Sequence, residues 1–163
     1  MADINFKVDG LSEVKFAKGD AVMVEGTKSN RVYLLKAGTV GVTAGGTEIC
    51  KISQPLSIFG EIGALLDCAH SATVKTTEEC TFYVIESLPA YCKANPESGI
   101  RIAEVLAQRL VNMNSHFVEF KNEITALGAL EKDLAFAKQI SKLILRMDKF
   151  WGREIIETKP RQK

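Results

Sequence analysis

Short runs of alternating apolar and polar residues occupy the first half of the chain and predict β-strands. The runs are rich in β-branched and aromatic residues, and turn-forming stretches such as AKGD, GTKSN and AGGT separate them. Because many short strands joined by regular turns are typical of sandwiches and barrels, the pattern predicts an all-β domain up to about residue 86. The expected strands cover residues 13–18, 21–26, 31–36, 39–44, 47–52, 71–76 and 80–86.

Helical signals replace the strand pattern after residue 86. Ser87 and Pro89 open a short helix, and Asn95 with Pro96 supplies the cap and the first-turn proline of a much longer one. Gly128 interrupts the long helix, and a second helix follows it. The expected divisions are a β-domain with the short helix (1–95), the long helix (96–127), and a second amphipathic helix with a basic tail (128–163).

The long helix carries apolar residues at alternating spacings of four and three, which is the heptad pattern of paired helices. This seam consists of Leu106, Leu110, Met113, Phe117, Phe120, Ile124 and Leu127. A second stripe, in a new register, consists of Phe136, Ile140, Leu143, Met147 and Phe150. Both stripes could instead cover the chain's own β-domain, but Val105, Val111 and Val118 offer a separate apolar edge for that contact. We therefore expect a homodimer joined along the seam.

Composition and charge narrow the choice of partners. The 163 residues are 46% hydrophobic and 25% charged, with a formal net charge of +1, so no overall basic field favours nucleic acid. No apolar run approaches the roughly 20 residues that cross a bilayer, and the opening MADINFKVDG lacks the features of a secretion signal. We expect a cytoplasmic protein that does not bind membranes.

The four cysteines stand singly, without a CxxC pair, and the chain has two histidines. A tetrahedral zinc site or a jelly-roll metalloenzyme needs several converging ligands, so we expect no metal and no enzyme activity. In a reducing compartment such cysteines are usually buried and inert. They are Cys50, Cys68, Cys80 and Cys92.

Residues 59–74, FGEIGALLDCAHSATV, form the segment with the clearest chemistry, and we call it the cassette. It combines two glycines, one glutamate, one histidine and a hydroxyl pair with small and apolar residues. Free backbone amides at a helix N-terminus bind an anionic phosphate, and glycines let a ligand approach the backbone closely. The segment therefore predicts a phosphate-binding loop and helix start.

The order of these motifs resembles a known family. EGTKSNRVYLLKAGTVGV, then FGEIGALL, then HSATV, then a short helix and a long seam-bearing helix resemble the cyclic nucleotide-binding domain of bacterial catabolite-activator-type regulators. The resemblance covers about residues 11–127. It implies a mainly β fold with C-terminal helices, in which a β-roll, or jelly roll, is followed by the long dimerisation helix.

The resemblance also implies ligand contacts. The amides of the first helical turn would bind the phosphate, Glu61 would accept a hydrogen bond from the ribose 2′-hydroxyl, and polar residues of the long helix would close over the base. Glu61 could instead be a carboxylate that only stabilises the helix start. Asn112 or Asn122 could replace the expected pair on the long helix. The expected contacts are Gly60, Glu61, Ile62, Gly63, Ala64, His70, Ser71, Ala72, Asn114 and Ser115.

His70 departs from the family pattern, which carries an arginine that pairs with the cyclic phosphate. A charge-assisted hydrogen bond contributes about 1.5–3 kcal/mol, so its loss weakens binding. If the imidazole faces the phosphate, affinity should rise as the pH falls from about 8 to 6. His70 could equally be a solvated loop residue without a ligand. The second histidine, His116, lies off the seam and is expected to face solvent.

Together these features predict a stand-alone regulatory module that binds a cyclic nucleotide, cAMP in preference to cGMP, and needs no cofactor. Its partner would be an unknown protein rather than DNA, because 35 residues follow Gly128 and a helix-turn-helix reader needs several helices. The alternative is a degenerate domain that binds no nucleotide and serves as a dimeric interaction scaffold.

Overall fold

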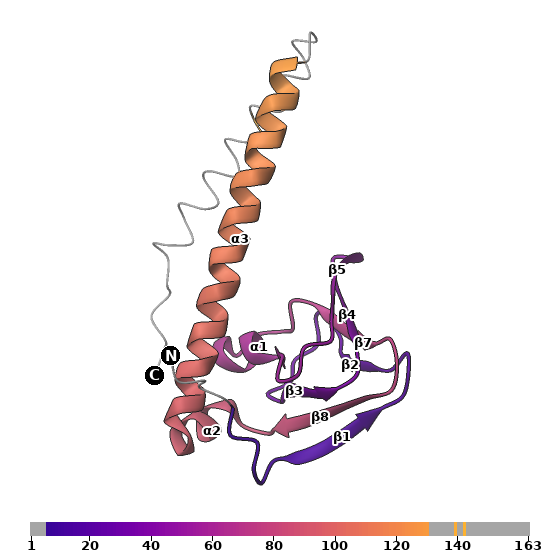
Figure 1. Ribbon diagram of the computed structural model, residues 1–163, viewed down its shortest axis with the longest axis vertical. Helices are drawn as coiled ribbons and strands as arrows, with labels where there is room; N and C mark the ends of the chain where they lie inside the picture. The colour runs from indigo at the N-terminus through magenta and orange to yellow at the C-terminus, as the bar shows by residue number, and fades with distance from the viewer. Residues whose placement is uncertain (1–5, 131–138, 140–141, 143–163) are drawn as a thin grey trace. The chain divides into compact units, whose positions relative to one another are not determined.

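A computed structural model of the chain describes residues 6–130, 139 and 142 (Figure 1). Eight strands form two four-stranded antiparallel sheets, which confirms the mainly β fold with C-terminal helices. The first sheet has the order β1 (Ser12–Phe16), β8 (Cys80–Ile85), β3 (Val32–Ala37), β6 (Ile58–Phe59). The second has the order β2 (Ala21–Met23), β7 (Thr73–Thr76), β4 (Val40–Ala44), β5 (Thr47–Ile52).

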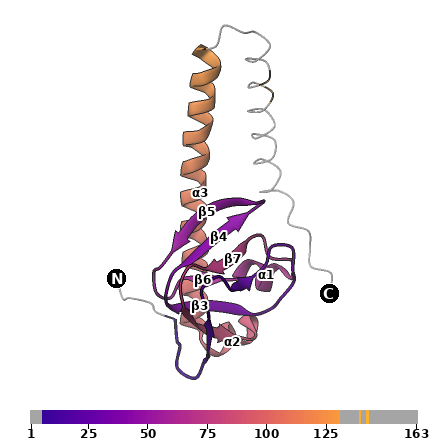
Figure 2. The same ribbon diagram turned by 90° about the vertical axis from the view of Figure 1, so that its right-hand side faces the viewer.

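The two sheets enclose one apolar core, and in Figure 2 the hairpin of β4 and β5 lies above β3. Phe82 is fully buried at its centre and meets the rings of Phe16, Tyr33 and Phe59 edge-on, at centroid distances of 5.7, 6.0 and 6.3 Å. Edge-to-face contacts of this kind suit the charge distribution of aromatic rings. The core cluster contains Val22, Met23, Leu35, Val40, Phe59, Val74, Cys80 and Phe82.

The seven strands expected from the sequence are present, and one further strand joins them. β6 has two residues and pairs Ile58 with Leu34 and Phe59 with Tyr33 of β3. A two-residue strand is too short to show an alternating pattern, so the sequence did not predict it. Its position matters because the cassette begins at its second residue.

Among the described residues, one helix lies between two strands and two helices follow the last strand. The helix α1 (Glu61–Leu66) lies between β6 and β7, and α2 (Leu88–Ala94) begins after Ser87, as expected. The helix α3 (Pro96–Leu130) begins at the expected proline but continues through Gly128. An isolated glycine costs a helix only about 1 kcal/mol, so Gly128 does not end it. The second stripe, at residues 136–150, lies outside the described residues.

The chain divides into two compact units, residues 1–104 and 105–163. The first contains both sheets, α1, α2 and the first turns of α3. The second begins within α3, at Val105. The cassette therefore belongs wholly to the first unit, and the expected seam belongs to the second.

Candidate functional site

The short helix α1 supplies the amides of the cassette. Gly60 caps its N-terminus with a φ of 89°, and no side chain caps the first turn. Helix geometry leaves the N–H groups of Ile62 and Gly63 without an acceptor inside the helix. The N–H of Ala64 donates to the carbonyl of Gly60 at 3.1 Å. Two of the three expected amides therefore have no acceptor within the helix, whereas the amide of Ala64 is already bonded.

Glu61 occupies the first position of α1 and is only 2% exposed. A carboxylate at this place is favoured by the positive end of the helix dipole. Burial of a charge is costly unless polar groups satisfy it, and Glu61 does have a polar contact within the protein. Its side chain is thus an ordered part of the cassette rather than a solvated surface acid.

His70 is 5% exposed, which excludes the reading as a solvated loop residue. Its N–H donates to the carbonyl of Thr27 at 2.8 Å, and its own carbonyl accepts a hydrogen bond from the N–H of Gly26 at 2.9 Å. These bonds join the cassette to the loop between β2 and β3. Apart from the turn residues around Gly26, no local pattern in the sequence predicts this pairing, because it is a long-range backbone contact.

The two cassette glycines make room for the protein's own atoms. A Cβ on Gly60 would lie 2.8 Å from the carbonyl oxygen of Arg31 and 3.0 Å from Cε of Met23. A Cβ on Gly63 would lie 3.1 Å from the carbonyl oxygen of Cys68 and 3.2 Å from Nδ1 of His70. Gly60, which also has a positive φ, is therefore required by internal packing, whereas a Cβ on Gly63 would need its neighbours to move by a few tenths of an ångström. The sequence suggested ligand approach as the reason for both glycines.

The expected hydroxyl, that of Ser71, lies just before the strand β7 (Thr73–Thr76). Ser71 is exposed and Ala72 is half-buried, directly before β7. The hydroxyl of Thr73 accepts a hydrogen bond from the N–H of Glu25 at 2.9 Å, and the Glu25 carboxylate accepts one from the N–H of Gly45 at 2.9 Å. Ser71 is exposed, so its hydroxyl is accessible to a ligand. The hydroxyl of Thr73 is bonded to Glu25, which follows the strand β2.

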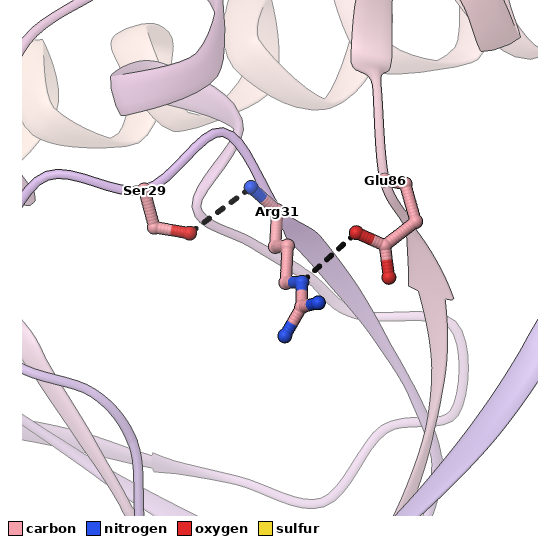
Figure 3. Close-up of polar contacts among 3 residues, drawn as sticks. All are labelled: Ser29, Arg31 and Glu86. Atoms are coloured by element: carbon pink, nitrogen blue, oxygen red, sulfur yellow. Dashed lines mark hydrogen bonds and ion pairs between the residues drawn. The ribbon is translucent and has the colours of Figure 1, made fainter.

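Arg31 stands beside the cassette without taking over the role of the absent arginine. Its N–H donates to Oγ of Ser29 at 3.1 Å, and its guanidinium Nε pairs with Oε2 of Glu86 at 2.9 Å (Figure 3). The Glu86 carboxylate raises the pKa of Arg31. The main-chain oxygen of Arg31 lies at the open side of Gly60, while its guanidinium is paired with Glu86.

The residues expected to close over the base lie on α3, in the second unit. Ser115 donates its hydroxyl proton to the carbonyl of Val111 at 3.2 Å, and Asn112 accepts a hydrogen bond from Gln108 at 3.0 Å. The Oδ1 atom of Asn114 is enclosed and accepts no hydrogen bond from the described part of the chain. Of these side chains, Asn114 is the one whose hydrogen-bonding capacity is not used locally.

The seam residues differ in exposure. Leu110, Met113 and Phe120 are at least half exposed, Leu106 and Phe117 are half-buried, and Ile124 is buried. The side chain of Leu127, the last seam residue, lies outside the part that the structure describes. His116 is exposed, as expected, with Nδ1 lying 3.3 Å from Oε2 of Glu119.

The structure also describes the potential metal ligands, the cysteines and the hydropathy of the helices. Among the described residues, no group of three or more His, Cys, Asp or Glu side chains could hold a metal ion. Cys80 is buried and Cys92 half-buried, and burial raises the pKa of both thiols. Cys50 and Cys68 are exposed, so the expectation of four buried cysteines was wrong for these two. No helix within the described ranges is long and apolar enough to span a bilayer.

Comparison with known proteins identifies relatives of the segment that contains the cassette. Residues 13–88 match the family model of the cyclic nucleotide-binding domain. The chain is 27% identical over 157 residues to the potassium channel SKOR of Arabidopsis thaliana, covering 91% of this chain and 18% of the channel. It is 31% identical over 147 residues to a cGMP-dependent protein kinase of Eimeria tenella, covering 88% of this chain and 13% of the kinase.

A solved structure shares the fold. The catabolite activator protein of Thermus thermophilus aligns with a TM-score of 0.64 and 17% identity, over 94% of this chain and 84% of that one. The chain itself spans less than a fifth of the length of the two curated relatives.

Proposed function

Because residues 13–88 form a domain of the cyclic nucleotide-binding family, we propose that the protein is a non-enzymatic regulatory module that binds a cyclic purine nucleotide. One observation carries this proposal. Within the matched segment, α1 places two amides without intrahelical acceptors beside the buried carboxylate of Glu61. Amides that face a phosphate and a carboxylate that faces a ribose hydroxyl are complementary to the two polar ends of a cyclic nucleotide.

Each residue expected to contact the nucleotide then has a role, except Ala64, whose amide is bonded to Gly60. The N–H groups of Ile62 and Gly63 bind the cyclic phosphate, with the hydroxyl of Ser71 and the amide of Ala72 on its other side. Glu61 accepts a hydrogen bond from the ribose 2′-hydroxyl. Gly60 shapes the turn that orients these groups, and Asn114, with Ser115 as the second candidate, contacts the base. His70 belongs to this set by its place in the cassette.

We further propose that cAMP is preferred to cGMP, on the resemblance of the cassette to catabolite-activator-type regulators. Occupancy is passed on by closure of α3, and the output is contact with another protein. The cytoplasmic location stays a prediction from the sequence.

Calorimetric titration of the full chain with cAMP, cGMP and 2′-deoxy-cAMP tests the proposal. Removing a hydrogen bond to a charged group costs about 1.5–3 kcal/mol, which is about ten- to a hundredfold in affinity. The unaltered protein should therefore bind cAMP at least about tenfold more tightly than 2′-deoxy-cAMP. Glu61→Gln should lose most of that difference, because the neutral amide is a weaker acceptor.

Glu48→Gln is the matched control, since Glu48 is an exposed acid on β5, outside the cassette. It should bind all three nucleotides as the unaltered protein does. Absence of binding of both cAMP and cGMP at millimolar concentration would contradict the proposed function.

The alternative function is a dimeric scaffold with a degenerate cassette. One observation favours it: the cassette has a buried histidine at residue 70, and the guanidinium of the neighbouring Arg31 is paired with Glu86. A site without a fixed cation holds an anion less tightly. The same titration decides, because a scaffold would form its dimer but give no heat with any cyclic nucleotide.

A further inference from the structure

His70 has a backbone that is held on both sides. Its N–H and C=O bond to the carbonyl of Thr27 and the N–H of Gly26, at 2.8 and 2.9 Å. Such a pair of bonds fixes the position of Cα and the direction in which the side chain leaves the backbone. The side chain is therefore placed by the loop between β2 and β3, which also meets the C-cap of α1 through the ion pair of Lys28 with Asp67 at 2.8 Å.

The imidazole lies against the two glycines at the start of α1. A Cβ on Gly63 would come 3.2 Å from Nδ1 and 3.6 Å from Cε1, and a Cβ on Gly60 would come 3.7 Å from Cε1. Since neither residue has a Cβ, the ring packs on bare backbone. This packing and the other neighbours of His70 leave only 5% of its surface exposed.

The helix α1 needs such a contact. It has six residues, it has no side-chain cap, and the residues at both ends, Gly60 and Asp67, adopt left-handed backbone conformations. Isolated helices shorter than about 12 residues are marginal in water. Its outward side chains Ile62 and Leu66 are exposed and contribute little burial. Packing on its inner face must hold it in place.

We propose that His70 is a positioning residue of the cassette, whose imidazole supports α1 from beneath Gly60 and Gly63 and orders its amides before any nucleotide binds. The effect on affinity rests on the proposed function, whereas the effect on α1 does not. In this role the ring acts by its shape and not by its charge. The competing role is the one expected from the sequence, in which the charge of His70 binds the phosphate.

Hydrogen exchange in the ligand-free full chain tests the support of α1. The reporters are the N–H groups of Ala64 and Cys68, which donate to the carbonyls of Gly60 and Gly63. His70→Ala should speed the exchange of these two N–H groups at least tenfold. The exchange of the Thr77 N–H, which donates to the carbonyl of Thr39, should stay unchanged. His116→Ala, which removes the exposed histidine of α3, is the matched control and should change none of them. Unchanged protection of α1 in His70→Ala would overturn the proposal.

Gly63→Ala approaches the same contact from the other side. Its new methyl group would press on the ring, so the same two amides should lose protection in the His70 background. In the double variant His70→Ala/Gly63→Ala the loss should be smaller than the sum of the two single losses, because the methyl group enters the space of the ring. The carbonyl of Cys68, 3.1 Å from the methyl position, keeps the rescue partial. Additive losses would show that the two residues do not act through one contact.

Titration with cAMP separates shape from charge and separates this inference from the proposed function. His70→Asn keeps a planar polar group that cannot be protonated, and His70→Lys keeps a charge without the planar shape. The positioning role predicts that the asparagine variant retains more affinity than the lysine variant. The opposite order, or an affinity that rises more than threefold from pH 8 to pH 6 and loses this rise in His70→Asn, would overturn it. If the unaltered protein binds no nucleotide, the proposed function fails while the exchange experiment still decides the role of His70.

Discussion

Gly38 joins β3 to β4 at a point where any side chain would collide with the next strand. Its φ is +104°, and a Cβ there would lie 2.5 Å from Sγ of Cys80 and 2.7 Å from the carbonyl oxygen of Glu79. Because this glycine has no Cβ, the two sheets can close over the core at Cys80. A left-handed backbone alone is not the reason, because other turns of the domain share it.

Gly38→Ala should destabilise the protein by roughly 3 kcal/mol or more, because strain and steric overlap add. Gly45→Ala is the matched control, since Gly45 also has a positive φ, +56°, but nothing within 4 Å of its Cβ position. It should cost only about 1–2 kcal/mol. Urea unfolding of both variants measures the difference, and equal losses would show that backbone strain alone requires Gly38.

At the scale of elements, a buried hydrogen-bond network ties the N-terminal segment to the corner between α2 and α3. The hydroxyl of Tyr91 donates to the carbonyl of Lys7 at 2.9 Å and lies 3.0 Å from Oγ of Ser98. The N–H of Lys7 donates to the same Ser98 oxygen at 3.1 Å. Both side chains are buried. The N-terminal segment and the corner between α2 and α3, whose bonded residues are 84 and 91 positions apart, thus share one set of hydrogen-bonded polar atoms.

Tyr91→Phe should lower the free energy of unfolding by about 1–3 kcal/mol, because the Lys7 carbonyl and the buried Ser98 hydroxyl both lose a hydrogen-bond partner. Tyr83→Phe, at a half-buried position on β8, is the control and should stay within about 0.5 kcal/mol. Burial raises the pKa of Tyr91, so the folded protein keeps this proton at pH values where the unfolded chain loses it. The stabilisation is then present at neutral pH and is lost as the pH rises through the alkaline range.

Urea unfolding at pH 7.5 and in the alkaline range checks both statements. The unaltered protein should lose stability over this range, and Tyr91→Phe should lose less. A variant as stable as the unaltered protein at pH 7.5 would mean that the network does not support the corner.

At the scale of the whole molecule, the untested expectation is the homodimer along α3. Met113 and Phe120 of the seam are 56% and 51% exposed, and they lie seven residues apart on one face. Val111 and Val118 are exposed to nearly the same degree, 56% and 54%, on a different face. Exposure alone therefore does not choose between the two faces, whereas the heptad spacing favours the first.

Met113→Glu/Phe120→Glu should convert the protein into a folded monomer, because pairing would bury unpaired charges against their copies. Val111→Glu/Val118→Glu is matched in residue spacing, exposure and charge, and it should leave the dimer intact. Light scattering at micromolar concentration measures the mass of each. A monomeric unaltered protein would contradict the dimer, and loss of the dimer only in the valine pair would place the interface on the other face.

The sequence by itself determined the parts of this protein that depend on local patterns. Strand alternation and turn residues predicted seven of the eight strands, and the proline and cap signals located the starts of α2 and α3. The cassette was recognisable because its glycines, Glu61 and Ser71 lie within sixteen residues. Local propensity failed at β6, which is too short to show a period, and at Gly128, where the cost of one glycine does not end the helix.

Only the tertiary structure decided what those residues contact. The glycines of the cassette suggested ligand approach, yet the atoms that occupy their open sides are Arg31, Met23, Cys68 and His70 of the same protein. His70 could be read as a ligand contact or as a solvated residue until its backbone pairing with Gly26 and Thr27 showed it buried. Such contacts join segments about 40 residues apart, and long-range packing of this kind leaves no periodic or local signal in the chain. The same physical reason separates Cys80, buried where the sheets close, from Cys50 and Cys68, which remain exposed.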